Sequence, residues 1–142
     1  MKVSGHAVIS LTVGGILYYY SHSLAGFLGL LLTGIFVDLD HYIDYVREQG
    51  ISFDYMKIYS TCKDGDKHFK KLTLILHSYE LVIFLWLAIV FFNLNIMWQY
   101  ITVGLTLHLV VDQITNRVVP LAYFFSYRVA KNFETKKIFI DR

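Results

Sequence analysis

The chain has 142 residues, of which 56% are apolar or aromatic, and its mean hydropathy is +0.49. A soluble domain of this length cannot hide so much apolar surface in one core, so the composition favours a lipid bilayer as the main solvent. The formal net charge is only +2, and the single cysteine, Cys62, gives no disulfide framework and no zinc-finger pattern. The sequence also carries no glycine-rich phosphate loop and no direct nucleic-acid signature.

Apolar residues gather in five stretches, which cover residues 7–20, 24–37, 72–92, 96–111 and, more weakly, 118–127. A membrane-spanning helix needs about 20 residues, so the third stretch is long enough alone, and residues 3–20 and 24–42 suffice if polar groups lie at their ends. The polar triplets "SHS" at 21–23 and "NLN" at 93–95 predict turns. We therefore predict an all-α integral membrane four-helix bundle, a single domain over residues 1–142, with 118–127 as a candidate fifth, interfacial helix.

The cationic residues all fall on one side of this arrangement. With four spans, the N-terminus, the loop of about 43–71 and the tail of about 128–142 lie on one side of the membrane, and the two turns lie on the other. All 13 Lys and Arg residues fall on the first side. The positive-inside rule then predicts a multi-pass inner-membrane protein with both termini in the cytoplasm. Membrane lipid is the expected partner of the basic tail, and the oligomeric state is left open.

Each predicted helix carries titratable side chains near its cytoplasmic end: His6 in the first, "DLDHYID" at 38–44 after the second, His77 and Glu80 in the third, and His108 and Asp112 in the fourth. In an antiparallel bundle these places share one layer. Residues three or four positions apart stack on one helical face, so His108 with Asp112 and His77 with Glu80 each point to a common place. His41 and Asp44 of the 38–44 segment are spaced in the same way.

A divalent cation is the partner that satisfies imidazoles and carboxylates together. An unpaired Asp at mid-membrane costs about 2.5–3.5 kcal/mol on insertion scales, so such groups have partners. Zinc is the first prediction because it takes His nitrogen and Asp oxygen and leaves a position for water, whereas a carboxylate-rich site also suits manganese or two metals. Glu80, or a carboxylate of the 38–44 segment such as Asp40, would then be a general base or orient a ligand. The alternative is that the His108–Asp112 pair only forms an interhelical hydrogen bond to a neighbouring helix.

Four short motifs carry a resemblance to a known family: "GHAVIS" at 5–10, "DLDH" at 38–41, "LHS" at 76–78 and "GLTLHLVVDQITNRVVPLAYFF" at 104–125. In order and spacing they resemble the membrane-bound metal-dependent hydrolases, a family that includes the LexA-binding inner-membrane protein. The family pattern runs GHxxxS, PDxDH, HRGxTHS and HxxxDxxTxxGxxxLxxP. The resemblance covers nearly the whole chain apart from 45–67 and the last fifteen or so residues.

The resemblance implies a metal-dependent hydrolase, remotely similar to zinc-dependent phospholipase C and related single-strand nucleases. It implies a ligand set of His6, Asp38, His77, His108 and Asp112, with Asp40 and His41 in support. The chain departs from the pattern in several places. Leu72 and Thr73 stand where the family has His and Arg, Leu76 stands where it has Thr, Val37 replaces the first proline, and Pro120 falls earlier than the last one.

The leading functional prediction is hydrolysis of a phosphoester, such as a phospholipid headgroup, at the cytoplasmic face. The basic residues His68, Lys70 and Lys71 would hold the anionic substrate. One alternative is a noncatalytic scaffold or interaction protein in which a structural metal or a polar network ties the helices together. A transporter is the third, but it would need polar residues that continue to the outer side, where the sequence offers few beyond Ser21, His22 and Ser23.

Overall fold

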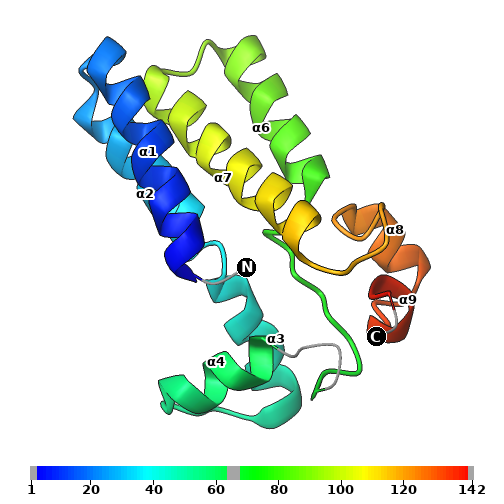
Figure 1. The fold of residues 1–142 in the computed structure, drawn as a ribbon. Helices are drawn as coiled ribbons and strands as arrows, with labels where there is room; N and C mark the ends of the chain where they lie inside the picture. The colour runs from blue at the N-terminus through cyan, green and yellow to red at the C-terminus, as the bar shows by residue number, and fades with distance from the viewer. Residues whose placement is uncertain (1–2, 64–67, 141–142) are drawn as a thin grey trace. The chain divides into compact units, whose positions relative to one another are not determined.

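The computed structural model of the protein describes residues 3–63 and 68–140 (Figure 1). Within these ranges the regular structure is helical apart from two isolated β-bridges, so the predicted all-α class is confirmed. The chain forms two compact units, the first of Met1–Val37 with Tyr79–Asn116 and the second of Asp38–Ser78 with Arg117–Arg142. Three of the cations used in the topology prediction, Lys2, Lys67 and Arg142, lie outside the described residues.

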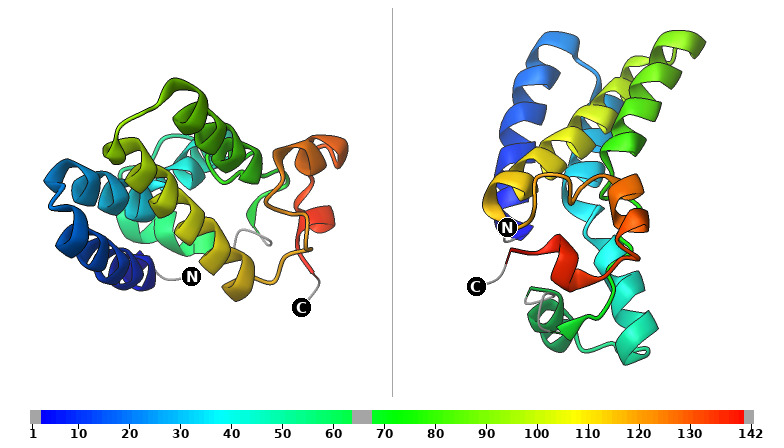
Figure 2. Two further views of the ribbon diagram at one scale, coloured as in Figure 1. Left: turned by 90° about the horizontal axis from the view of Figure 1, so that it is seen from above. Right: turned by 90° about the vertical axis from the view of Figure 1, so that its right-hand side faces the viewer.

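The described part of the first unit consists of α1 (Val3–Ser21), α2 (Leu24–Phe36), α6 (Tyr79–Phe92) and α7 (Ile96–Thr115). Helix α7 packs against the other three and lies between α6 and the α1–α2 pair (Figure 1 and Figure 2). Both predicted turns are confirmed. The Ser23 hydroxyl accepts the Gly26 N–H at 3.2 Å at the start of α2, and the Asn95 side chain accepts the Met97 N–H at 3.1 Å at the start of α7.

Glycines bring α2 and α7 close together. A methyl group at Gly104 would lie 2.6 Å from the carbonyl oxygen of Leu30, and one at Gly29 would lie 2.9 Å from Cγ1 of Ile101. The Thr33 hydroxyl of α2 donates to the Ile101 carbonyl of α7 at 3.0 Å. Small residues and hydroxyl bonds at helix contacts are typical of helices that pack in a membrane.

The first unit buries polar side chains and exposes apolar ones. Five polar residues are at most 3% exposed: His6, Ser10, Thr102, His108 and Asp112. On the outside, Phe84 is 65%, Val90 69% and Phe91 76% exposed, all on α6. Among the described residues, one helical stretch, Leu24–Gln49, is long and apolar enough to cross a membrane by length and composition, and α6 is apolar but shorter.

The second unit contains α3 (Leu39–Gln49), α4 (Tyr55–Lys63), α8 (Phe125–Ala130) and α9 (Thr135–Ile138) in its described part. Helices α3 and α4 pack against each other. Its core is formed by Tyr45 of α3 with Phe69, Leu72 and Leu74 of the segment that precedes α6. Leu72 also donates its N–H to the Phe133 carbonyl at 2.9 Å, which ties this segment to the C-terminal part of the chain.

The prediction of a helix from residue 72 is wrong for 72–78, because α6 begins only at Tyr79. Backbone N–H groups between residues 70 and 77 donate instead to three carboxylates of α3, which we call the carboxylate ladder. Glu48 accepts from Lys70 and Lys71, Asp44 from Thr73 and Leu74, and Asp40 from Leu76 and His77.

The candidate helix at 118–127 is also wrong in its position, since α8 covers Phe125–Ala130 instead. Residues 118 and 119 are extended: Val118 forms a bridge with Phe139, and the Val119 N–H donates to the Ile138 carbonyl at 2.9 Å. Pro120 then has no N–H to offer to a helix. Pairing with the C-terminal segment therefore replaces the first turns of the predicted helix.

Candidate functional site

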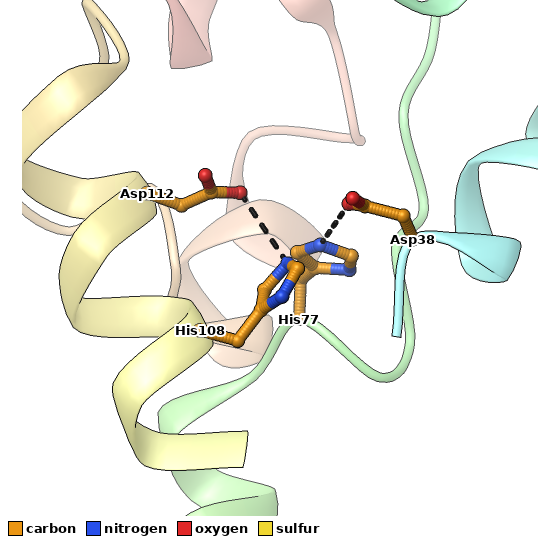
Figure 3. A group of neighbouring side chains, drawn as sticks. All are labelled: Asp38, His77, His108 and Asp112. Atoms are coloured by element: carbon orange, nitrogen blue, oxygen red, sulfur yellow. Dashed lines mark ion pairs between the residues drawn. The ribbon is translucent and has the colours of Figure 1, made fainter. Parts of the chain in front are cut away.

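His108 of α7 has both ring nitrogens directed at defined partners within the first unit. Its Nδ1 lies 3.0 Å from the carbonyl oxygen of Gly34 in α2. Because a carbonyl oxygen only accepts, Nδ1 carries a hydrogen and donates it to Gly34. The other ring nitrogen, Nε2, faces Oδ2 of Asp112, one helical turn further along α7, at 3.6 Å (Figure 3).

His6 of α1 joins this pair. Its Nε2 lies 3.0 Å from Oδ1 of Asp112, a hydrogen-bonding distance, and the two side chains are 2% and 5% exposed. The His6 ring also stacks on the His108 ring, with centroids 3.9 Å apart. The first unit therefore brings together His6, His108 and Asp112.

His77 of the second unit has a parallel arrangement. Its Nδ1 lies 3.3 Å from Oδ2 of Asp40, a carboxylate that is almost fully buried, and its Nε2 faces Oδ1 of Asp38 at 3.5 Å (Figure 3). His41 approaches the same Asp38 carboxylate at 3.8 Å, and its ring meets the His77 ring edge-on at a centroid distance of 5.0 Å. The second unit thus brings together Asp38, Asp40, His41 and His77.

The chemistry of the two His–Asp pairs fits a metal ion. In both, the ring Nδ1–H is held by an oxygen acceptor, and Nε2 faces a carboxylate oxygen at 3.5–3.6 Å, which is too long for a normal hydrogen bond. Metal-bound histidines commonly donate their other N–H to a carboxylate or a backbone carbonyl. Asp38 with His77 in the second unit, and His108 with Asp112 in the first, are therefore candidate metal ligands, and all but Asp38 are buried.

The remaining predicted residues fall in other places. Glu80 lies half-buried in the first turn of α6. His68, Lys70 and Lys71 line one open hollow of about 500 Å³ in the second unit, together with Glu48 and Gln49. The stacking of His77 with Glu80 on one helical face does not occur, because His77 precedes α6.

Sequence reasoning missed two residues that contact the histidines, Gly34 and Arg128, and assigned a third, Asp44, to another contact. Gly34 supplies the carbonyl that holds His108, and a glycine inside an apolar stretch gives no sign of this contact. Arg128 of α8, only 1% exposed, donates to the His77 carbonyl at 2.8 Å. Asp44 was expected to point with His41 toward a common place, but its carboxylate accepts the Thr73 and Leu74 N–H groups. The four-residue spacing of Asp40, Asp44 and Glu48 was the available signal.

Comparison of the chain with protein-family models, with curated proteins and with solved structures finds no match. Functional inference for this protein therefore depends on its own residues and on the motif resemblance.

Proposed function

We propose that the protein is a membrane-embedded, metal-dependent hydrolase that acts on phosphoesters, with phospholipid headgroups as the favoured substrates. The observation that carries the proposal is the shared geometry of His77 and His108. Each has its Nε2 directed at a carboxylate oxygen of Asp38 or Asp112 at 3.5–3.6 Å. An imidazole nitrogen and a carboxylate oxygen that face each other with little access to water need a proton or a cation between them.

Membrane embedding is supported by the inverted polarity of the first unit. Its interior holds His6, His108 and Asp112, whereas apolar side chains of α6 face outward. In a bilayer, polar and ionisable side chains face the interior of the bundle, and apolar ones face lipid. We therefore propose that α1, α2, α6 and α7 form an inner-membrane four-helix bundle with both termini in the cytoplasm.

The conformation of Leu74 adds support for the family resemblance. When "LHS" at 76–78 is placed on the end of the pattern HRGxTHS, the glycine of the pattern falls on Leu74. Leu74 has a φ of 44°, in the left-handed region that favours glycine. The backbone at this position therefore has the conformation that the glycine of the pattern would favour, although the residue here is leucine.

The expected chemistry divides the site residues by task. A zinc or manganese ion bound at the His–Asp pairs would polarise a phosphoryl oxygen and activate water for attack. In the first unit His108 and Asp112 would hold it, with His6 beside them, and in the second unit Asp38 and His77 would do so, with His41 beside them. Asp40 accepts N–H groups from Leu76 and His77, so it suits a positioning role better than proton transfer. Glu80 remains the proposed general base, and His68, Lys70 and Lys71 the proposed contacts to an anionic headgroup.

Elemental analysis of the detergent-purified protein tests the proposal. We expect near-stoichiometric zinc or manganese in the parent and none in a His108→Ala, Asp112→Ala variant. His22→Asn is the matched control, because His22 is exposed in the α1–α2 turn with a φ of 51°, a conformation that asparagine tolerates. A folded parent that binds no metal when zinc or manganese is supplied would overturn the hydrolase proposal.

A Glu80→Gln variant separates catalysis from metal binding. In a hydrolase it should keep the metal and lose turnover of the phosphoester that the parent cleaves. A scaffold predicts no activity in the parent and only a change of stability in the variant. The 3.0 Å hydrogen bond between His6 and Asp112 favours this second candidate, because it ties α1 to α7 without any metal.

A further inference from the structure

The carboxylate ladder is the feature of the second unit that the proposed chemistry does not yet use. Asp40, Asp44 and Glu48 lie on one face of α3 at four-residue spacing. Each accepts a pair of consecutive N–H groups from the segment that leads to His77. The shortest bond in each pair is 2.9 Å at Glu48, 2.7 Å at Asp44 and 2.7 Å at Asp40.

The ladder holds this segment in a conformation that its own sequence does not favour. Residues 72–76 are apolar apart from one threonine and would otherwise form helix or pack loosely. At its middle, Leu74 adopts the left-handed conformation, and its N–H donates to Oδ2 of Asp44 at 3.1 Å. Hydrogen bonds to an ionised carboxylate are stronger than neutral ones, so the Asp44 contacts can offset a strained backbone.

The ladder ends at the proposed metal ligand. Oδ2 of Asp40 accepts the N–H of Leu76 at 2.7 Å and also lies 3.3 Å from Nδ1 of His77. Position and ring orientation of His77 are thus set by the same carboxylate. Asp44 binds the chain just before this point. It fixes residues 73 and 74, and with them the direction in which the chain reaches Asp40.

We propose that Asp44 is a positioning residue for His77, which it keeps in the orientation that presents Nε2 toward Asp38. This inference rests on the proposed metal function. Asp44 itself is only 2% exposed, and its carboxylate is occupied by the Thr73 and Leu74 N–H groups, so it acts through the backbone rather than as a ligand. Partners that orient a ligand commonly change metal affinity 10–100-fold when they are removed.

Titration of the metal-free full chain with Co²⁺, followed by visible absorption, tests the proposal. Asp44→Ala should weaken Co²⁺ binding roughly 10–100-fold. At saturating Co²⁺ its spectrum should match that of His77→Ala, because the released imidazole no longer coordinates. The matched control is Glu48→Ala, which removes the exposed carboxylate of the ladder that lies farthest from His77. This variant should keep its Co²⁺ affinity within about 3-fold of the parent's and leave the spectrum unchanged. If the alanine variant does not fold, Asp44→Asn replaces it, because asparagine keeps one acceptor oxygen. The Co²⁺ affinity of Asp44→Asn should lie between that of the parent and that expected for Asp44→Ala.

The outcomes distinguish this inference from the proposed function. A parent that binds no Co²⁺ overturns both. A parent that binds Co²⁺, with Asp44 variants of unchanged affinity and spectrum, overturns the positioning role alone. If Asp44→Ala and Glu48→Ala weaken binding equally and neither spectrum changes, Asp44 contributes only to stability, and the inference is also wrong.

Discussion

Each of the two central histidines uses its ring nitrogens for separate tasks. The Nδ1–H of His108 is held by a backbone carbonyl and that of His77 by a carboxylate, which leaves Nε2 of each ring directed at an aspartate. Such anchoring fixes the tautomer and the ring plane before any ion binds. A ligand that is already oriented loses less entropy on binding, which is why buried anchors of this kind matter for affinity.

Cys62 of α4 lies beside His41 in the second unit but is unsuited to react. Burial, together with the negative charges of Asp38 and Asp44, raises the pKa of the Cys62 thiol to about 11. Since the thiolate is the reactive form, we expect iodoacetamide at pH 8 to modify the folded protein roughly 100-fold more slowly than the denatured protein. The rate of mass addition in each state measures this, and equal rates would contradict it.

The same raised pKa makes stability depend on pH. As pH rises, the unfolded chain loses the Cys62 proton first, because its thiol has the ordinary, lower pKa. The folded chain keeps the proton until the pH approaches about 11. The folded state therefore binds more protons in this interval, and the contribution of Cys62 to the free energy of unfolding decreases as the pH rises.

Glycine residues allow helices α2 and α7 to approach each other closely. An alanine at Gly104 would place its Cβ 2.6 Å from the Leu30 carbonyl oxygen, which belongs to the backbone and cannot rotate away. We expect Gly104→Ala to lower the free energy of unfolding by about 1–3 kcal/mol, as overpacked contacts do, and to reduce metal content by moving His108 away from Gly34.

The matched control for this substitution is Gly15→Ala. Gly15 also lies in a helix, but an added Cβ would meet nothing within 4 Å. This control should be neutral or gain up to about 1 kcal/mol from helix propensity. Thermal unfolding in detergent, with metal content measured on the same samples, compares the two variants. Equal melting temperatures would show that the close approach of α2 and α7 does not contribute to stability.

The elements differ in how far the sequence could predict them. The turns at 21–23 and 93–95 were predictable because Ser23 and Asn95 form local caps, which depend only on neighbouring residues. The start of α6 was not predictable, because residues 72–78 are apolar like a helix, but Thr73, Leu74 and Leu76 donate their N–H groups to carboxylates of α3 that lie 29 to 36 positions away. Contacts of this range leave no periodic pattern in the sequence.

The sequence could likewise predict some residues of the candidate site but not others. Residue types and spacing were enough to select His6, His77, His108 and Asp112, since buried titratable groups within apolar stretches need partners. Spacing also suggested that His77 acts from a helix, and this was wrong because the ladder holds it in a non-helical segment before α6. The anchors Gly34 and Arg128 contribute a carbonyl and a guanidinium through tertiary contacts alone, so sequence patterns could not reveal them.

At the scale of the whole molecule, the charge distribution makes the most definite prediction about orientation. If four helices cross the membrane, the turns at 21–23 and 93–95 lie outside, and α8 and α9, with their cations Arg128, Lys136 and Lys137, lie in the cytoplasm. Cysteine labelling measures this directly. On a Cys62→Ser background, we expect Tyr20→Cys, at a position 78% exposed, to react with a membrane-impermeant maleimide in intact spheroplasts.

Lys136→Cys, at an exposed position of α9, is the matched variant and should react only after the membrane is permeabilised. The physical reason is the cost of moving cationic segments across the membrane, which retains them on the cytoplasmic side. The opposite labelling pattern would reverse the orientation and move the proposed site to the outer face. Labelling of both variants in sealed spheroplasts would contradict an even number of spans. Recovery of the unlabelled protein in the soluble fraction would contradict the membrane assignment itself, and with it the choice of a lipid headgroup as substrate.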